Sequence, residues 1–286
     1  TAASGSGNIT YQWQSSTTSI NSGYTNIIGA TSPTYDPPPG LTITTYYQVI
    51  VTSVLNGVSC TANSNPISVT VNNVSAGTLS QTQTICNGGD ANPFTVVTAA
   101  TGTGTLTYQW QSSTTSAVAG FTNIIGATNA TYDPPGGQTV TTFFRLIVTS
   151  TLNGIVCTST SAVLTVFVNN ISPSVITNSQ TICSGGNPAA FTNTTAATGT
   201  GTLSYQWQSS TTSQVAGFTN IQNAIQSTYD APAGLTVTTY YQVIITSTLN
   251  GVPCTAISNP LTVFVNTINA QTIAANQTIC SNGDPV

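Results

Sequence analysis

Six cysteines are the residues of this sequence whose type and spacing most plainly indicate chemistry. They form two series with a constant interval of 97 residues: Cys60, Cys157 and Cys254, then Cys86, Cys183 and Cys280. Thiols of this kind form disulfides or bind a metal. Zinc is disfavoured, because the chain contains no histidine and its cysteines lack the usual ligand spacing. Regular cysteine usage instead indicates disulfides in an oxidising, extracellular setting.

Other side chains offer little chemistry. The 286 residues contain one arginine, five aspartates, and no lysine, glutamate or histidine. Acid–base or nucleophilic catalysis needs a base, an activated nucleophile or a metal cluster, and isolated aspartates supply none of these. We therefore expect no enzyme, no cofactor and no metal site. The lack of positive charge also argues against a nucleic-acid partner.

The aspartates fall at repeated positions. Asp36, Asp133 and Asp230 follow the tyrosine of "TYDPP" or "TYDAP". A single carboxylate is a poor calcium site, so an aspartate bonded to its own turn is the favoured interpretation over a calcium ligand. Asp90 and Asp284 occupy a position that is Asn187 in the other copy, which indicates a glycine-rich turn rather than a metal site.

The interval of 97 residues extends along the whole sequence. "YQWQSSTTS" occurs three times and places Trp13, Trp110 and Trp207 in register. A unit of this length is close to a common domain size and is long enough to enclose its own core. We predict repeats at 1–74, 75–171 and 172–268, and the start of a fourth at 269–286. Because Thr1 aligns with Thr98, inside a repeat, we expect the sequence to be part of a longer chain.

Polar and apolar residues alternate within each repeat, which is typical of half-buried strands. Tyr108 and Trp110 share one face of "LTYQWQSS", so we expect all three tryptophans in the core. Asn153-Gly154 and its copies predict a hairpin. Turn signals roughly every 8 to 12 residues indicate about seven strands and a β-sandwich. No segment has a helical pattern, and no apolar run approaches the ~18 residues of a membrane span.

These motifs resemble a known family. "QTICSGGNP", "YQWQSSTT", "FTNI", "TTYYQVI" and "TSTLNGVPCTAISNP" are similar to the tandem immunoglobulin-like repeats of very large surface proteins of Bacteroidetes of the Flavobacterium and Cytophaga type. The resemblance spans essentially every residue of each repeat. It implies export to the cell surface, typically by the type IX secretion system, and roles in adhesion, gliding or surface filaments.

The cysteine pairs follow from the expected sandwich topology. Antibody-type domains place their cysteines on the second and sixth strands, and this chain does not. If the first and last strands run parallel, their beginnings meet at one pole, which predicts Cys86–Cys157 and Cys183–Cys254 within repeats, one bridge per complete repeat. Cys60 and Cys280 would then pair outside the sequence. A linker-spanning Cys60–Cys86 pair is the competing interpretation.

Two outward aromatics suggest a contact surface. Phe167 and Phe264 fall on the outer row of the last strand, where the first repeat has Thr70, and could touch a neighbouring domain or chain. Overall, the sequence predicts an all-β rod of tandem domains that bears tension in an extracellular bacterial fibre or stalk and self-associates. The alternative is an adhesin that presents many weak glycan- or surface-binding sites.

Overall fold

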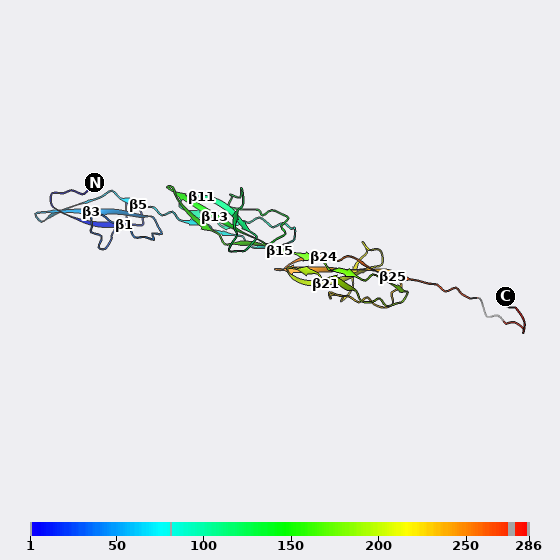
Figure 1. The fold of residues 1–286 in the computed structure, drawn as a ribbon. Coiled ribbons are helices and arrows are strands. Elements are labelled where there is room, and N and C mark those ends of the chain that lie inside the picture. The colour runs from blue at the N-terminus through cyan, green and yellow to red at the C-terminus, as the bar shows by residue number, and fades with distance from the viewer. Residues whose placement is uncertain (1, 81, 274–277, 285–286) are drawn as a thin grey trace. The chain divides into compact units, whose positions relative to one another are not determined.

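A computed structural model describes residues 2–80, 82–273 and 278–284. All regular elements in these ranges are β-strands, and Figure 1 shows them as arrows along the chain. The predicted all-β, immunoglobulin-like fold of largely antiparallel strands is therefore confirmed. Each complete repeat holds more strands than the seven expected, because several extra pairs are only two to four residues long.

The chain packs as two compact parts. One comprises Thr1–Gln81, Pro93–Asp133 and Phe143–Thr165, and the other comprises Thr82–Asn92, Pro134–Thr142 and Val166–Val286. The first contains the first repeat and its junction with the second. The other contains the third repeat and its junction with the second. The domain bounds at 74, 171 and 268 stay a prediction, and the segment 269–286 lies partly outside the described residues.

The first repeat forms one antiparallel sheet. Its strands are β1 (Asn8–Ser16), β2 (Thr25–Asn26), β3 (Thr45–Leu55), β4 (Val58–Asn63) and β5 (Ile67–Val69). β3 pairs with β1, β4 and β5, and β1 also pairs with β2. Among the described residues of this repeat, none forms a counterpart of the strands that precede the tryptophan strand in the later copies.

The second repeat contributes ten strands. They are β6 (Val74–Ser75), β7 (Thr78–Leu79), β8 (Gln83–Cys86), β9 (Val96–Thr98), β10 (Thr101–Gly102), β11 (Thr105–Ser113), β12 (Thr122–Asn123), β13 (Thr142–Leu152), β14 (Ile155–Thr160) and β15 (Leu164–Asn169). β13 pairs antiparallel with β11 and β14. β8 runs parallel to β15, so that Cys86 lies opposite Asn169.

The third repeat contributes the same ten strands. They are β16 (Ile171–Ser172), β17 (Val175–Thr177), β18 (Gln180–Cys183), β19 (Thr192–Thr195), β20 (Thr198–Gly199), β21 (Thr202–Ser210), β22 (Thr219–Asn220), β23 (Thr239–Leu249), β24 (Val252–Ile257) and β25 (Leu261–Asn266). Its main sheet has the order β18-β25-β23-β21-β22, with β24 paired to β23. β18 and β25 are again parallel.

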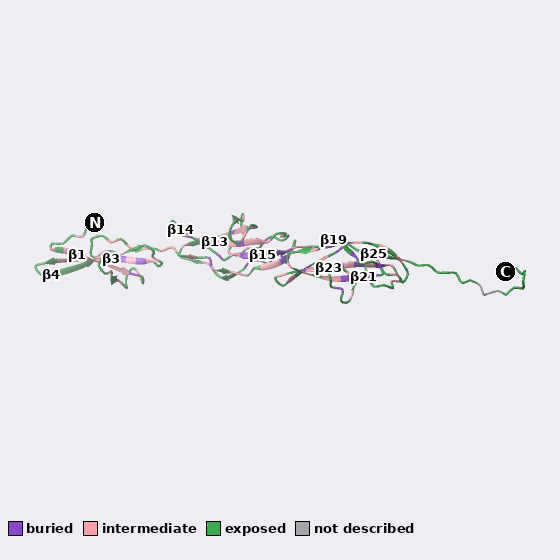
Figure 2. Cartoon of the chain, turned by 60° about the horizontal axis from the view of Figure 1, so that its bottom comes forward, coloured by how far each residue is buried: buried purple, intermediate pink, exposed green. Residues whose placement is uncertain are grey.

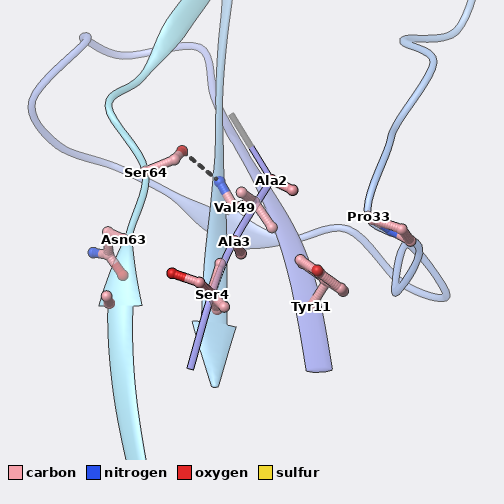
Figure 3. Close-up of a pocket in the computed structure, with 10 residues that line it drawn as sticks. Ala2, Ala3, Ser4, Tyr11, Pro33, Val49, Asn63 and Ser64 are labelled. Atoms are coloured by element: carbon pink, nitrogen blue, oxygen red, sulfur yellow. Dashed lines mark hydrogen bonds between the residues drawn. The ribbon is translucent and has the colours of Figure 1, made fainter. Parts of the chain in front are cut away.

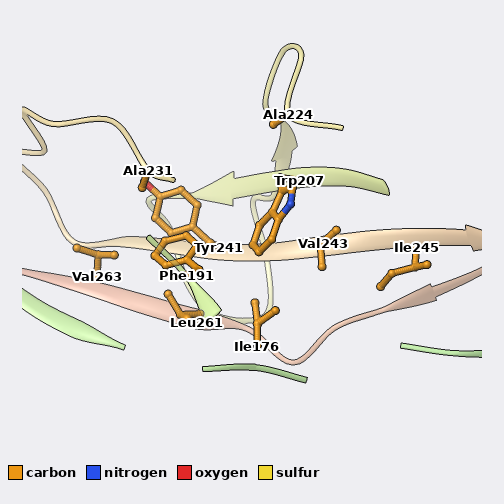
Figure 4. Packing of buried hydrophobic residues seen from close by; sticks show 10 residues of the cluster. All are labelled: Ile176, Phe191, Trp207, Ala224, Ala231, Tyr241, Val243, Ile245, Leu261 and Val263. Carbon is orange, nitrogen blue, oxygen red and sulfur yellow. The ribbon is translucent and has the colours of Figure 1, made fainter. Parts of the chain in front are cut away.

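A hydrophobic core fills the third repeat. Alternate residues of each strand point inward, as period-2 patterning requires. Figure 4 shows Trp207, Tyr241 and Val243 from the main sheet facing Ile176 and Phe191 from the opposite layer. Trp207, Val243 and Ile245 are completely buried. After β25 the chain leaves this core, and its described residues are exposed (Figure 2).

Candidate functional site: the junctions between repeats

The structure brings Cys86 and Cys254 together. They form a disulfide with a Cα–Cα distance of 5.6 Å, and they belong to successive repeats. The predicted pairs Cys86–Cys157 and Cys183–Cys254 are therefore wrong. Cys86 also has no bond to Cys60, so the linker-spanning alternative is wrong as well. The covalent link joins β8, near the beginning of the second repeat in the sequence, to β24, near the end of the third.

The strand register explains the error. The prediction placed the "QTIC" cysteine where the first and last strands begin, but it occupies the end of β8 and of β18. In the third repeat Cys254 pairs with Ser247, Thr239 pairs with Val263, and Cys183 pairs with Asn266. The two cysteines are thus eleven positions apart along the sheet, about 36 Å at the usual strand rise. A disulfide requires Cα atoms within about 7 Å.

A tight hairpin presents Cys254 to the preceding repeat. Asn250 and Gly251 connect β23 to β24 with φ angles of 50° and 81°, the left-handed conformation that an Asn-Gly turn accommodates. The Asn250 side chain donates a hydrogen bond of 3.1 Å to Thr84 Oγ1 on β8 of the second repeat. The hairpin tip therefore contacts the same strand that carries Cys86.

Asn169 forms the polar centre of this junction. It ends β15 and is completely buried. Its Nδ2 donates to the carbonyl oxygens of Ser247 at 2.7 Å and Val252 at 3.0 Å, and its Oδ1 accepts from Ser247 Oγ at 2.7 Å. Thr200 Oγ1 adds a further bond of 3.1 Å to Oδ1. A buried amide is stable only when its donors and acceptors are satisfied, so this geometry fixes the hairpin against the preceding strand.

The junction between the first and second repeats has the same hydrogen bonds. Asn72 Nδ2 donates to the carbonyl oxygens of Ser150 at 2.8 Å and Ile155 at 2.9 Å, and Ser150 Oγ donates to Asn72 Oδ1 at 2.7 Å. Thr103 Oγ1 reaches the same oxygen at 3.2 Å. The interval of 97 residues therefore places the same asparagine–serine hydrogen bonds at both junctions.

Sequence reasoning missed these asparagines and serines. Asn72, Asn169 and Asn266 stand at the interval of 97, as do Ser53, Ser150 and Ser247. For the serines, the signal was a polar residue repeated at the end of an otherwise apolar inward-facing row, as in Phe144, Leu146, Val148 and Ser150 of β13. The role of these residues became clear only from the structure, in which the last strand of one repeat contacts the hairpin of the next.

Four cysteines carry free thiols. Cys60, Cys183 and Cys280 are exposed, and Cys157 is half-buried. By the interval of 97, Cys157 and Cys60 are counterparts of Cys254, and Cys183 and Cys280 are counterparts of Cys86. At the separation of 168 residues that joins Cys86 to Cys254, the equivalent partner position of each of these four cysteines falls outside the 286 residues.

The tryptophans occupy different environments. Trp110 and Trp207 are completely buried, whereas Trp13 is half-buried. Trp110 stacks on Phe94 with ring centroids 5.6 Å apart, and Trp207 lies 5.8 Å from Phe191. Trp13 lies 5.7 Å from Tyr35, and the described residues of the first repeat contain no counterpart of these phenylalanines.

Burial of the aromatic cluster raises the pKa of its tyrosines. In the third repeat, desolvation followed by the nearby Tyr229 raises the pKa of Tyr241 to about 12, although a hydrogen bond with Thr239 opposes the shift. In the first repeat, desolvation and then Tyr35 raise the pKa of Tyr47. These phenols stay neutral at physiological pH and serve the core rather than chemistry.

The predicted contact residues and the single arginine lie on the surface rows. Phe264 is 48% exposed, while Phe167 is half-buried beside Thr84 on the adjoining strand. Their role in contacts stays a prediction. Arg145 lies over the ring of Phe121, with its guanidinium carbon 4.1 Å from the centroid, and donates to Gln111 Oε1 at 2.7 Å.

The aspartates lie apart and exposed, at Asp36, Asp90, Asp133, Asp230 and Asp284. Among the described residues, no three acidic, cysteine or histidine side chains gather as a metal site would require. Within residues 2–80, 82–273 and 278–284 we find no helical segment with the length and hydrophobicity of a membrane crossing.

Two surface pockets open on the first repeat. One, of about 380 Å³, is lined by residues that include Ala2, Tyr11, Pro33 and Val49 (Figure 3). The other, of about 390 Å³, is lined by Gly5, Ser6, Ser53, Leu55, Val58 and Cys60. The counterpart of the first pocket in the second repeat measures about 50 Å³, because Ala76, Leu79 and Val96 cover it.

The fold and the joints define a tandem array of immunoglobulin-like domains. Residues 1–73, 75–170 and 172–267 each match one family, described as "Domain of unknown function (DUF8696)". The chain therefore belongs to this family, with three copies in tandem. No curated protein matches the sequence.

Solved structures that align with this chain include three N-terminal domains of the Highly Immunogenic Outer Capsid protein of bacteriophage RB49. The alignment covers 92% of this chain and 89% of that chain, with 11% identity and a TM-score of 0.41. Extracellular domains 3–5 of Drosophila OTK align over 78% of this chain and 71% of that chain, with 16% identity and a TM-score of 0.30.

Proposed function

We propose that this chain is a structural module of an extracellular bacterial surface fibre or stalk, and that its immunoglobulin-like repeats carry tension. The observation that carries the proposal is the disulfide between Cys86 and Cys254, which spans the junction of successive repeats. A covalent bond at a junction resists separation of the repeats, whereas a bond inside a repeat protects only that repeat.

The disulfide defines a short path for force. Tension that enters through β8 reaches Cys86, crosses to Cys254 and continues along β24 into β25. The residues between the two cysteines, with a sequence separation of 168, are bypassed and carry no load. Hydrogen bonds at Asn72 and Asn169 hold both junctions in register. The disulfide also implies an oxidising compartment, in keeping with the extracellular location that the sequence resemblance implies.

Stretching single molecules tests this role. With the disulfide intact, forced unfolding leaves the bypassed segment folded or slack. After reduction we expect an additional extension of about 590 Å, from 168 residues at about 3.5 Å each. The Cys254→Ala variant should show the longer extension without reductant, and Cys60→Ala should behave as the unaltered chain. Equal extension before and after reduction would contradict the proposed force path.

An adhesin that presents weak glycan sites along the array is the alternative. Phe264 provides an exposed ring, but its counterparts are a half-buried Phe167 and Thr70, so this feature does not repeat along the array. Binding of the three-repeat chain to a glycan array, abolished by Phe264→Ala, would favour the adhesin.

A further inference from the structure

Each main sheet carries a regular row of hydroxyl groups on the face opposite its core. In the second repeat, Thr149 of β13 pairs with Thr107 of β11 on one side and with Thr158 of β14 on the other. Directly paired residues of antiparallel strands point to the same face, and the neighbouring Val148 is completely buried in the core. The three threonines therefore point away from the core, where Thr107 and Thr158 are exposed and Thr149 is half-buried.

The same row occurs in all three repeats. Its members are Thr10, Thr52 and Thr61 in the first, Thr107, Thr149 and Thr158 in the second, and Ser204, Thr246 and Thr255 in the third. Other exposed positions change character at the interval of 97 residues, as the turn tips Ile28, Ile125 and Gln222 do. β1 and β4 are as long as β11 and β14, so the row is complete in the first repeat as well.

The hydroxyls of these rows are free to bind an outside partner. None of them forms a hydrogen bond with another group among the described residues, whereas Thr103 and Thr200 use their hydroxyls at the junctions. A threonine hydroxyl both donates and accepts. Its β-branched side chain has a restricted χ1, so little rotational freedom is lost when it binds.

The rows on either side are also uncharged. Two residues along the strands in one direction lie Asn8, Val54 and Ser59, then Thr105, Thr151 and Val156, then Thr202, Thr248 and Pro253. In the other direction lie Gln12, Ile50 and Asn63, then Gln109, Ile147 and Thr160, then Gln206, Ile244 and Ile257. These three rows form the outer grid of each repeat, which contains no charged or aromatic side chain. Arg145 lies one row beyond and places its guanidinium over Phe121.

Strand geometry spaces the outer grid as a two-dimensional lattice. Neighbouring strands lie about 4.8 Å apart, and alternate residues of one strand are about 6.7 Å apart. Rows of water molecules in the prism faces of hexagonal ice recur at closely similar intervals in the two directions. The grid is only three strands wide, which limits the divergence that sheet twist produces. A frozen lattice therefore meets several hydroxyls of one outer grid at once.

We propose that the outer grid of each repeat binds ice. The hydroxyls of the central row hydrogen-bond to water molecules of the lattice, and the threonine methyl groups exclude disordered water from the contact. A charged side chain would keep its own hydration shell, and the grid has none. A polysaccharide is the less favoured occupant, because the grid offers no aromatic ring to stack on a sugar.

Partition into growing ice tests the proposal. A dilute solution of the 286-residue chain is frozen slowly onto a cold surface, and tryptophan absorbance gives the protein concentration in the ice and in the remaining liquid. Solutes without affinity for ice are left in the liquid. We expect the chain to be enriched in the ice and to keep ice grains small during annealing. An equal or lower concentration in the ice would overturn the proposal.

Lysine substitutions identify the binding face. The test variant carries a lysine at the centre of every outer grid, through Thr52→Lys, Thr149→Lys and Thr246→Lys. We expect at least about a tenfold lower enrichment, because each hydrated ammonium group holds the grid away from the ice. The matched control carries the same added charge at exposed turn tips, through Ile28→Lys, Ile125→Lys and Gln222→Lys. It should keep the enrichment, and an equal loss in the control would overturn the assignment to the outer grid.

A valine variant separates the hydroxyls from the fold. Thr52→Val, Thr149→Val and Thr246→Val keep the shape of the side chains and suit a strand. We expect an unchanged unfolding temperature and about a fivefold lower enrichment, the effect of one lost hydrogen bond of ordinary strength. Full enrichment of this variant would overturn the role of the hydroxyls.

Two further measurements distinguish other occupants of the outer grid. Retention of the chain on cellulose or chitin, abolished by the lysine variant, would replace ice by a polysaccharide. Oligomers in sedimentation that the lysine variant disperses would replace it by a second copy. Either result would overturn the proposal. Neither affects the tension-bearing role, which depends on Cys86–Cys254.

Discussion

The first and third repeats share nearly the same motifs but differ in how well those motifs are covered. Trp207 is completely buried between Phe191 and Tyr229, whereas Trp13 is half-buried with Tyr35 as its ring neighbour. Ser247 is completely buried at a joint, and Ser53 borders an open pocket. Identical side chains are therefore buried differently, because the third repeat includes the residues before its tryptophan strand that cover the core, and the 286 residues do not include their counterparts in the first repeat.

The difference shows that the 97-residue unit is not self-sufficient in its polar and covalent contacts. The hairpins of the second and third repeats each bind an asparagine from the preceding repeat, and Cys254 is bonded to Cys86 of that repeat. Interface terms between neighbours thus add to the stability of each repeat, as in other repeat proteins.

The largest difference between the two repeats should come from their hairpin cysteines. Cys254→Ala opens a disulfide with a sequence separation of 168, which the chain-entropy model values at about 5 kcal/mol as an upper figure. Cys60→Ala removes an exposed free thiol and should leave the unfolding temperature unchanged. Calorimetry with and without reductant measures both. Equal changes in unfolding temperature for the two variants would show that the Cys86–Cys254 disulfide does not stabilise the third repeat.

The tryptophans should give the next largest difference. Trp207→Ala empties a completely buried site and should destabilise the third repeat by about 3–5 kcal/mol. Trp13→Ala should cost less, because Trp13 is half-buried and lacks the stacked phenylalanine. Denaturant titration followed by the fluorescence of the remaining tryptophans measures each loss. If Trp13→Ala lowered the free energy of unfolding as much as Trp207→Ala, the partial exposure of Trp13 would not explain its contribution to stability.

The paired serines sharpen the comparison at the joints. Ser247 Oγ donates to Asn169 Oδ1 at 2.7 Å and accepts from the Gly201 N–H at 3.0 Å. Ser247→Ala should therefore cost about 1–3 kcal/mol by leaving buried groups unpaired. Ser53 accepts only from Gly7 N–H at 3.2 Å among its side-chain hydrogen bonds in the described chain, so Ser53→Ala should cost about 1 kcal/mol or less. Amide hydrogen exchange at each hairpin reports the effect, and a larger loss at Ser53 would reverse the ranking.

The smallest expected difference between the first and third repeats is the dependence of their stability on alkaline pH, through Tyr47 and Tyr241. The pKa of Tyr241 is raised from 10.0 to about 12, so the folded state holds this proton more tightly than the unfolded state. Its contribution to stability is complete below pH 10.0 and is lost as the pH rises toward about 12. Tyr241→Phe should flatten this decline more than Tyr47→Phe. Calorimetry across this range tests it, and unchanged slopes in both variants would contradict the assignment.

Local pattern determined much of this protein. Alternation around Trp110 and Trp207 fixed which side chains face the core, and Asn153-Gly154 and Asn250-Gly251 fixed the hairpins, because strand period and turn conformation depend on neighbouring residues. The interval of 97 residues also marked the cysteines as a structural set. These features need no knowledge of distant contacts.

The partner of each cysteine was decided by tertiary structure alone. The choice between Cys157 and Cys254 for Cys86 depends on the parallel register of β8 and β15, which places Cys86 beside Asn169 at the end facing the next hairpin. A one-dimensional repeat cannot distinguish these partners, because they are the same residue one repeat apart. In the folded sheet, the two cysteines of one repeat lie at opposite ends, about a strand length apart. Cys86 can therefore reach the hairpin of the next repeat but not that of its own.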